Sequence, residues 1–239
     1  YDCCDETLDK CLKQKKICKL VRRLRDDICR RVRKGQSDKK IKHALERRAR
    51  SMTPGGKKAS ISLADLPVAG QDTAPVTVVV YACARCPFCS KVVPDLYRMV
   101  VSGPLKGKVR MFFKTFPIRS HKGSAPAGLA FMAALELDKF WPYLLKAYRE
   151  FDSFDEAKLT TWASSVGLDT AAFAREMKDK GNRKQLVEFK KEGLRNGVKA
   201  TPTLFINGRQ YYGDMDRTSL LDVLGEAHDR ARKRQYCGG

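Results

Sequence analysis

The chain has 239 residues, of which 43% are hydrophobic, so it is long enough for one large domain or for one domain with an appendage. This composition excludes a wholly disordered chain, and no apolar run reaches the roughly 20 residues that span a bilayer. The formal net charge is +21, and residues 1–58 contribute +12 of it through 20 Lys or Arg and 8 Asp or Glu. These charges are spread along expected helices without a nucleic-acid-binding motif. We therefore interpret them as a solvated helix surface and expect no nucleic-acid partner.

Nine cysteines are present, and five of them lie in the first 29 residues. Cysteines this dense serve as metal ligands in a reducing cytosol and form disulfides in an oxidising compartment. No His or second Cys-x-x-Cys pair accompanies them at zinc-finger spacing, so we expect disulfides and no metal site. The first residues do not resemble a signal peptide. We therefore expect a periplasmic or secreted protein whose signal peptide is absent from this chain.

Residues 1–52 are expected to form a small, basic, Cys-rich α-helical region. Gly35 stands where the end of one helix favours a positive φ, and Ser37 can cap the next helix. Pro and Gly residues then break the helical pattern, so we place a linker at residues 53–59. The apolar face of the first long helix, at spacings of three and four, comprises Ile17, Leu20, Val21, Leu24, Ile28 and Val32.

The pairing of the cysteines stays open at this stage. Cys4, Cys11 and Cys18 are seven residues apart, which on one helix would separate neighbours by about 10.5 Å, beyond the reach of a disulfide. We therefore expect any bridge to join different helices or to tie this region to the rest of the protein. The odd number of cysteines leaves at least one thiol free or bonded to another chain. The open set is Cys3, Cys4, Cys11, Cys18, Cys29, Cys83 and Cys237.

Residues 60–239 are expected to form an α/β domain with a helical insertion at about residues 122–195. The first strand is β-branched and almost entirely apolar, which is typical of a strand buried on both faces. An Asn-Gly pair predicts a tight hairpin turn near the C-terminus. In chain order the expected elements are a strand at 76–81, a helix to Met99 interrupted by Pro94, a strand at 109–116, helices over 124–195, a hairpin over 204–212 and a helix from Asp216.

The candidate catalytic pair is Cys86 and Cys89, which follow the first strand as Cys86-Pro87-Phe88-Cys89. Placed at the start of a helix, Cys86 faces unpaired backbone N–H groups and the positive end of the helix dipole, which favour its thiolate. Pro87 suits the first helical position, where its missing N–H costs nothing. Cys89 lies on the same face and can resolve a mixed disulfide. We therefore expect Cys86 to be the exposed attacking sulfur and Cys89 to lie beneath it.

Two other interpretations of these cysteines remain open. The series Cys83, Cys86 and Cys89 resembles an iron–sulfur run, but Val93 stands where the fourth ligand would be. A structural disulfide, Cys86–Cys89 or Cys83–Cys86, is the second alternative, and Pro87 argues against it. We interpret Cys83 as a residue at the end of the strand that can bond to the N-terminal region.

Residues 75–239 resemble the DsbA-like branch of the thioredoxin superfamily, in the order of its motifs and over about two-thirds of the chain. The resemblance implies a thioredoxin-like fold with an inserted helical domain. It also implies that the Thr201–Pro202 bond is cis and lies beside the dithiol, where the backbone binds an extended substrate peptide. The matching segments are 76–81, the motif Cys86-Pro87-Phe88-Cys89, Phe116-Pro117-Ile118 with His121 and Ser124, and the run 197–208 around Thr201-Pro202-Thr203.

Phe88 departs from the family pattern. The strongly oxidising members usually have His before the second cysteine, and Phe offers the Cys86 thiolate no side-chain hydrogen bond or charge. We therefore expect Pro87 and Phe88 to tune the site toward a less oxidising disulfide. Thr at position 201, before the proline, resembles the residue that the isomerase and reductase relatives have there more than that of the strongest oxidases.

Residues 23–50 are also faintly similar to the helical domain of CcmH, a thiol reductase of cytochrome c maturation.

The sequence therefore predicts a thiol–disulfide oxidoreductase that acts on exported proteins, with Cys86 as nucleophile, Cys89 as resolving thiol, and Thr201 and Pro202 as substrate-binding residues. We expect no cofactor, protein substrates that carry thiols or disulfides, and a membrane-bound or soluble redox partner. The alternative enzyme is an isomerase or reductase dedicated to one partner, such as an apocytochrome or a metal-handling protein. In a third, non-catalytic hypothesis the thioredoxin domain is only a scaffold, and residues 1–52 mediate oligomerisation or partner binding.

Overall fold

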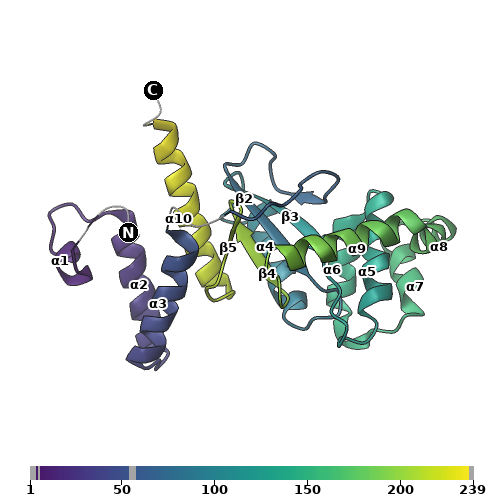
Figure 1. Cartoon of the computed structure of the whole chain (residues 1–239), viewed down its shortest axis with the longest axis horizontal. Helices are drawn as coiled ribbons and strands as arrows, with labels where there is room; N and C mark the ends of the chain where they lie inside the picture. The colour runs from purple at the N-terminus through teal and green to yellow at the C-terminus, as the bar shows by residue number, and fades with distance from the viewer. Residues whose placement is uncertain (1–3, 5, 54–57, 237–239) are drawn as a thin grey trace.

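A five-stranded sheet lies at the centre of the molecule in a computed structural model, which describes residues 4, 6–53 and 58–236 (Figure 1). The spatial order is β1-β3-β2-β4-β5, in which β2 runs parallel to β3 and antiparallel to β4. The two edge strands are each antiparallel to their neighbour. The strands are β1 (Val68–Ala69), β2 (Val76–Ala82), β3 (Val109–Thr115), β4 (Thr203–Ile206) and β5 (Arg209–Gln210).

Strand β2 is buried on both faces, as its sequence predicted. Val78 and Val80 belong to the larger hydrophobic cluster, whereas Val79 and Tyr81 belong to the smaller cluster on the opposite face. Alternation of side chains along a strand produces this division. The strand therefore brings the cysteine motif that follows it to the centre of the sheet.

Helices cover both faces of the sheet, which confirms the α/β class. Helix α4 (Cys89–Val101) follows β2, and the helical insertion between β3 and β4 confirms the predicted helical block. In the smaller hydrophobic cluster, Leu186 and Phe189 of the last insertion helix pack with Tyr81 and Phe205 of the sheet. The insertion comprises α5 (Ser124–Glu136), α6 (Phe140–Arg149), the 3-10 helix η1 (Phe151–Ser153), α7 (Lys158–Ser165), α8 (Thr170–Lys178) and α9 (Lys180–Arg195).

The predicted hairpin joins β4 to β5. Asn207 and Gly208 have φ of +50° and +81°, the left-handed conformations that a two-residue turn of this kind requires. Strand β1 is the one strand that the sequence did not predict. It pairs with β3 through two residues, Val68 with Phe112 and Ala69 with Met111, too few to produce a recognisable alternation.

The N-terminal region is helical, as predicted, and it packs against the C-terminal helix (Figure 1). Gly35 adopts φ of +66° between the two long helices. Residues 54–57 of the expected linker lie outside the described part of the chain, so the division at 53–59 stays a prediction. The helices are α1 (Leu8–Leu12), α2 (Lys19–Arg33), α3 (Asp38–Met52) and the C-terminal α10 (Arg217–Tyr236).

A buried ionic network joins this N-terminal region to α10. The guanidinium of Arg48 on α3 pairs with Asp222 and Glu226 of α10 at 2.5 and 2.8 Å. Arg23 of α2 adds bonds to Asp222 and Asp229, at 3.1 and 2.9 Å. A buried charge without a partner is costly, so an arrangement of α2, α3 and α10 that separated these ion pairs would be disfavoured.

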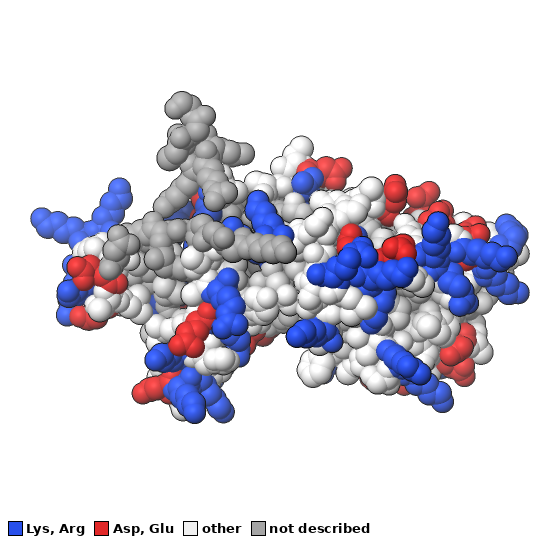
Figure 2. Space-filling view, viewed as in Figure 1, with Lys and Arg blue, Asp and Glu red and all other residues white. Residues whose placement is uncertain are grey.

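Charged side chains are scattered over the visible face of the molecule, between areas of uncharged surface (Figure 2). Figure 2 shows Lys and Arg over both the N-terminal helices and the insertion, interspersed with Asp and Glu. This distribution agrees with the interpretation of the positive charge as a solvated helix surface. Within the described ranges, no helix combines the length and apolar character required to cross a bilayer.

Candidate active site

Cys86 and Cys89 lie where β2 leads into α4. The Cys86 N–H donates to the carbonyl of Cys83 at 3.2 Å, and the Cys86 carbonyl accepts from the N–H of Ser90 at 3.1 Å. Helical hydrogen bonding therefore starts at Cys86, although the regular helix α4 begins at Cys89. The strand, the turn and the first helical turn place both sulfur atoms at one end of the sheet.

The Cys86 thiol is strongly acidified. The hydrogen bond from Cys89 lowers the pKa of Cys86 most, and together with smaller contributions it outweighs burial and brings the pKa to about 5. The smaller contributions come from the backbone N–H groups of Cys89 and Phe88 and from the side chain of Thr201. Phe88 therefore stabilises the thiolate through its backbone, which any residue at that position provides. At neutral pH Cys86 is a thiolate.

Cys89 has the opposite character. Burial raises the pKa of Cys89 well above its ordinary value, and the hydrogen bond to Cys86 and the negative charge there raise it further. Cys89 is fully buried, so it remains a neutral thiol that donates to its neighbour. The two cysteines therefore differ in ionisation, with a thiolate at Cys86 and a protonated thiol at Cys89.

The expected exposure of Cys86 is wrong. Only 2% of its surface is accessible, while the neighbouring Phe88 is 70% exposed. The Cys86 sulfur lies 3.2 Å from the carbonyl oxygen of Thr201, so the loop before β4 covers it. Sequence spacing could not predict this, because Thr201 is 115 residues away along the chain.

The loop that covers Cys86 contains a cis peptide bond between Thr201 and Pro202. Strand β4 begins directly after it, at Thr203, and pairs with β2. The Thr203 hydroxyl donates to the carbonyl of Ala200 at 2.7 Å and closes the loop from within. The fold thus brings Thr201, Pro202 and the two cysteines together, although the sequence separates them widely.

Cys83 differs from its expected role. It is a free, fully buried thiol and is not bonded to the N-terminal region. Nδ1 of His121 lies 3.4 Å from its sulfur, and the Arg85 N–H donates to that sulfur at 3.4 Å. No group of three or more His, Cys, Asp or Glu in the described residues has a geometry that could hold a metal ion.

Arg85 is a residue of the site that no sequence pattern indicated. Its guanidinium lies 4.4 and 4.0 Å from the ring centroids of Phe151 and Phe154, and it donates to the Phe151 carbonyl at 2.7 Å. These contacts tie the active-site turn to the insertion through cation–π attraction. The aromatic partners are more than 60 residues away, so no local pattern marks them.

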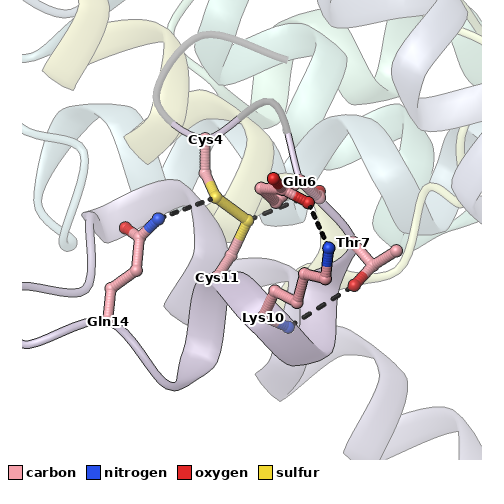
Figure 3. Close-up of a disulfide and its surroundings, with 6 residues drawn as sticks. All are labelled: Cys4, Glu6, Thr7, Lys10, Cys11 and Gln14. Atoms are coloured by element: carbon pink, nitrogen blue, oxygen red, sulfur yellow. Dashed lines mark hydrogen bonds and ion pairs between the residues drawn. A yellow bond between two sulfur atoms is a disulfide. The ribbon is translucent and has the colours of Figure 1, made fainter.

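The N-terminal disulfide corrects the pairing expected from helix spacing. Cys4 bonds to Cys11, so the bridge joins a helix to the segment just before it rather than to a second helix (Figure 3). Cys4 lies outside α1, which brings the two Cα atoms to 6.1 Å. Cys18 is also disulfide-bonded and Cys29 is a free, exposed thiol, whereas Cys3 and Cys237 lie outside the described residues.

Comparison with known proteins agrees with this architecture. The family described as Thioredoxin matches residues 64–225, more than half of the chain. The chain belongs to the thioredoxin family. The strands, the cysteine turn and the loop with the cis peptide bond all lie within the matched residues.

Two solved structures resemble the thioredoxin domain and its insertion. Oxidised BdbD from Bacillus subtilis is 21% identical, with a TM-score of 0.63, over 72% of this chain and 97% of that one. The thiol-disulfide exchange protein α-DsbA2 from Wolbachia pipientis is 21% identical, with a TM-score of 0.61, over 69% of this chain and 88% of that one. At this identity the likeness concerns the fold, which is a DsbA-like thioredoxin fold.

A curated relative has a much longer chain. The Na(+)/H(+) antiporter NhaA 3 of Salinispora tropica is 30% identical over 174 residues, which are 72% of this chain and 26% of the relative. The chain therefore spans about a quarter of the length of the curated relatives it matches. Most of the antiporter's length therefore has no counterpart in this chain.

Proposed function

We propose that the chain is a thiol–disulfide oxidoreductase that exchanges disulfides with exported proteins, with Cys86 as nucleophile and Cys89 as resolving thiol. The observation that carries the proposal is the opposite ionisation of the two cysteines. The pKa of Cys86 is lowered to about 5, and that of Cys89 is raised. Dithiol exchange needs one ready thiolate and one thiol held in reserve.

The exchange proceeds in two balanced steps. The Cys86 thiolate attacks one sulfur of a substrate disulfide, which forms a mixed disulfide and expels the other substrate sulfur as a thiolate. Cys89 then loses its proton and attacks the Cys86 sulfur, which forms the Cys86–Cys89 disulfide and releases the substrate thiol. The reverse sequence transfers the disulfide to a substrate dithiol.

The second step becomes easier once the first has occurred. Two of the influences that raise the pKa of Cys89 are the hydrogen bond to Cys86 and its negative charge. Both disappear when the Cys86 sulfur is bonded to substrate, while the backbone N–H of Cys83 continues to favour the Cys89 thiolate. Formation of the mixed disulfide thus activates the resolving thiol.

Substrate binding is assigned to the loop at Thr201 and Pro202, with Pro87 and Phe88 on the opposite side. The Thr201 carbonyl contacts the Cys86 sulfur at 3.2 Å, so an extended peptide lying along this loop would present its own sulfur to Cys86. Phe88, at 70% exposed, offers an apolar surface to such a peptide. These contacts support protein thiols as the substrate class and leave the identity of the redox partner to experiment.

An oxidising compartment is supported by the Cys4–Cys11 disulfide and by the disulfide at Cys18. We place the protein in the periplasm or outside the cell on this ground.

Oligomerisation through residues 1–52 stays a prediction. The exposed side of α2 and α3 carries an apolar groove that includes Val32 and Leu45.

Trapping of the mixed disulfide tests the proposal. A Cys89→Ala chain should accumulate covalent adducts with cellular protein thiols that reducing agent releases, because the resolving thiol is missing. The Cys86→Ser/Cys89→Ala chain is the matched control and should accumulate none. Equal amounts of adduct in both chains would refute Cys86 as the nucleophile. A dedicated reductase or isomerase would be indicated by adducts with one predominant partner.

A further inference from the structure

A third cysteine lies at the active site without a role in the exchange just described. Cys83 precedes Cys86 by three residues and is fully buried and free. Its carbonyl accepts the Cys86 N–H at 3.2 Å across the turn formed by Ala84 and Arg85. A turn closed in this way holds its first and last Cα atoms within about 7 Å, the range in which disulfides form. The backbone therefore brings the Cα atoms of Cys83 and Cys86 into the range of separation that a disulfide requires.

The same turn is held firmly by its surroundings. The Tyr148 hydroxyl donates to the Cys83 carbonyl at 3.2 Å, beside the bond from Cys86. Arg85 anchors the middle of the turn on the Phe151 and Phe154 rings. These contacts hold the backbone of the turn between the two cysteines in place.

The contacts of the Cys83 sulfur suit a reacting thiol. Nδ1 of His121 lies 3.4 Å away and can accept the thiol proton when the imidazole proton is on Nε2. Burial raises the pKa of the Cys83 thiol, so it needs a base to lose its proton; the Arg85 N–H, which donates to the sulfur at 3.4 Å, and the positive charge of Lys190 oppose this rise and favour the thiolate. A cysteine that only fills the core needs no base beside its sulfur.

We infer that Cys83 is a second resolving thiol, which attacks the Cys86 sulfur of a mixed disulfide and releases the substrate. His121 accepts the Cys83 proton, a Cys83–Cys86 disulfide forms, and the bond between Cys86 and the substrate breaks, with the electron pair leaving on the substrate sulfur. Cys89 can later attack Cys86, which transfers the disulfide to Cys86–Cys89 and returns Cys83 to the thiol. The inference rests on the proposed role of Cys86 as nucleophile.

The experiment removes Cys89 so that Cys83 is the one thiol left beside Cys86 at the active site. The Cys89→Ala chain, with Cys3, Cys4, Cys11, Cys18, Cys29 and Cys237 replaced by Ser so that Cys83 and Cys86 are its two remaining cysteines, is reduced and treated with 5,5′-dithiobis(2-nitrobenzoate) to place thionitrobenzoate on Cys86. Excess reagent is removed, and release of thionitrobenzoate is followed by absorbance. The matched control adds Cys83→Ser, with Cys83→Ala as a second replacement where the serine variant does not fold.

One equivalent of thionitrobenzoate should be released in a first-order process, with a rate constant that does not depend on protein concentration. Peptide mapping should then find a Cys83–Cys86 disulfide, and release from the control should be slower by about 100-fold or more. His121→Gln in the Cys89→Ala chain should slow release by about tenfold or more at pH 7 and make the rate rise with pH. A histidine that only packs would not change the pH profile.

Two results would overturn the inference, and they are distinguishable. An adduct that forms on Cys86 but persists equally in the Cys89→Ala chain and its control refutes the role of Cys83 and leaves the proposed function intact. Failure of Cys86 to form the adduct refutes the proposed function and with it this inference. Peptide mapping of the Cys89→Ala chain decides the matter even without a folded Cys83 variant.

Discussion

Ionisation of Cys86 should make the stability of the reduced protein depend on pH. Its pKa is about 5 in the folded chain and about 8.5 in an unfolded one. Between these values the unfolded state binds one more proton, so the free energy of unfolding rises with pH by about 1.4 kcal/mol per unit. The stabilisation is therefore complete above the unfolded pKa and is lost as the pH falls through about 5. At pH 7 it amounts to about 2.7 kcal/mol.

Urea unfolding of the reduced chain at pH 4.5, 6, 7 and 8, compared with Cys86→Ser, isolates this contribution. The difference in unfolding free energy between the two chains should increase by about 2 to 3 kcal/mol from pH 5 to pH 7. Both chains receive the same reductant, so the loss of the N-terminal disulfides is common to them. Cys89 stays protonated throughout this range because its pKa is raised, and it adds no slope.

A difference in unfolding free energy that stays constant from pH 5 to pH 8 would refute the lowered pKa of Cys86 and the hydrogen bonds assigned to it.

The lowered pKa of Cys86 also bears on redox chemistry. Whatever stabilises the reduced thiolate relative to the disulfide makes the disulfide a stronger oxidant. The backbone N–H groups and Cys89 supply that stabilisation here, without a histidine at the position of Phe88.

Arg48→Ala should lower the free energy of unfolding by about 3 kcal/mol in urea titrations, because it removes the buried guanidinium that bridges Asp222 and Glu226 of α10. Lys42→Ala, exposed on the same helix, removes the same charge and should cost less than about 0.5 kcal/mol; equal losses would contradict the network. Cys89→Ala should raise the pKa of Cys86 by about one unit or more in thiolate absorbance titrations, since Cys89 contributes the largest lowering. Phe88→Ala should leave that pKa unchanged, and an equal shift in both variants would contradict the assignment.

Local pattern was sufficient to predict much of the fold. The apolar run at 76–81 predicted β2, and Asn207-Gly208 predicted the hairpin, because each signal lies within a few residues of the structure it specifies. The dithiol could be found for the same reason, since Cys86 and Cys89 are three residues apart. β1 was missed because two residues carry no periodicity.

Long-range contacts account for what the sequence could not predict. The cover over Cys86 comes from Thr201, and the partners of Arg48 come from the far end of the chain. Neither pairing leaves a mark in the spacing of its residues. The Cys4–Cys11 bridge differs from the expectation for a local reason, because a spacing of seven excludes a disulfide only within one helix, whereas α1 begins at Leu8 and leaves Cys4 outside it.

The acidity of Cys86, on which the proposed exchange depends, can be measured through the rate at which the reduced residue reacts with iodoacetamide from pH 4 to pH 9. The alkylated residue is identified by peptide mass spectrometry. The account predicts modification of Cys86 with a half-maximal rate near pH 5 and a plateau through neutral pH, because the rate follows the thiolate fraction. A rate that keeps rising about tenfold per pH unit up to pH 8 would show an ordinary thiol and contradict the account.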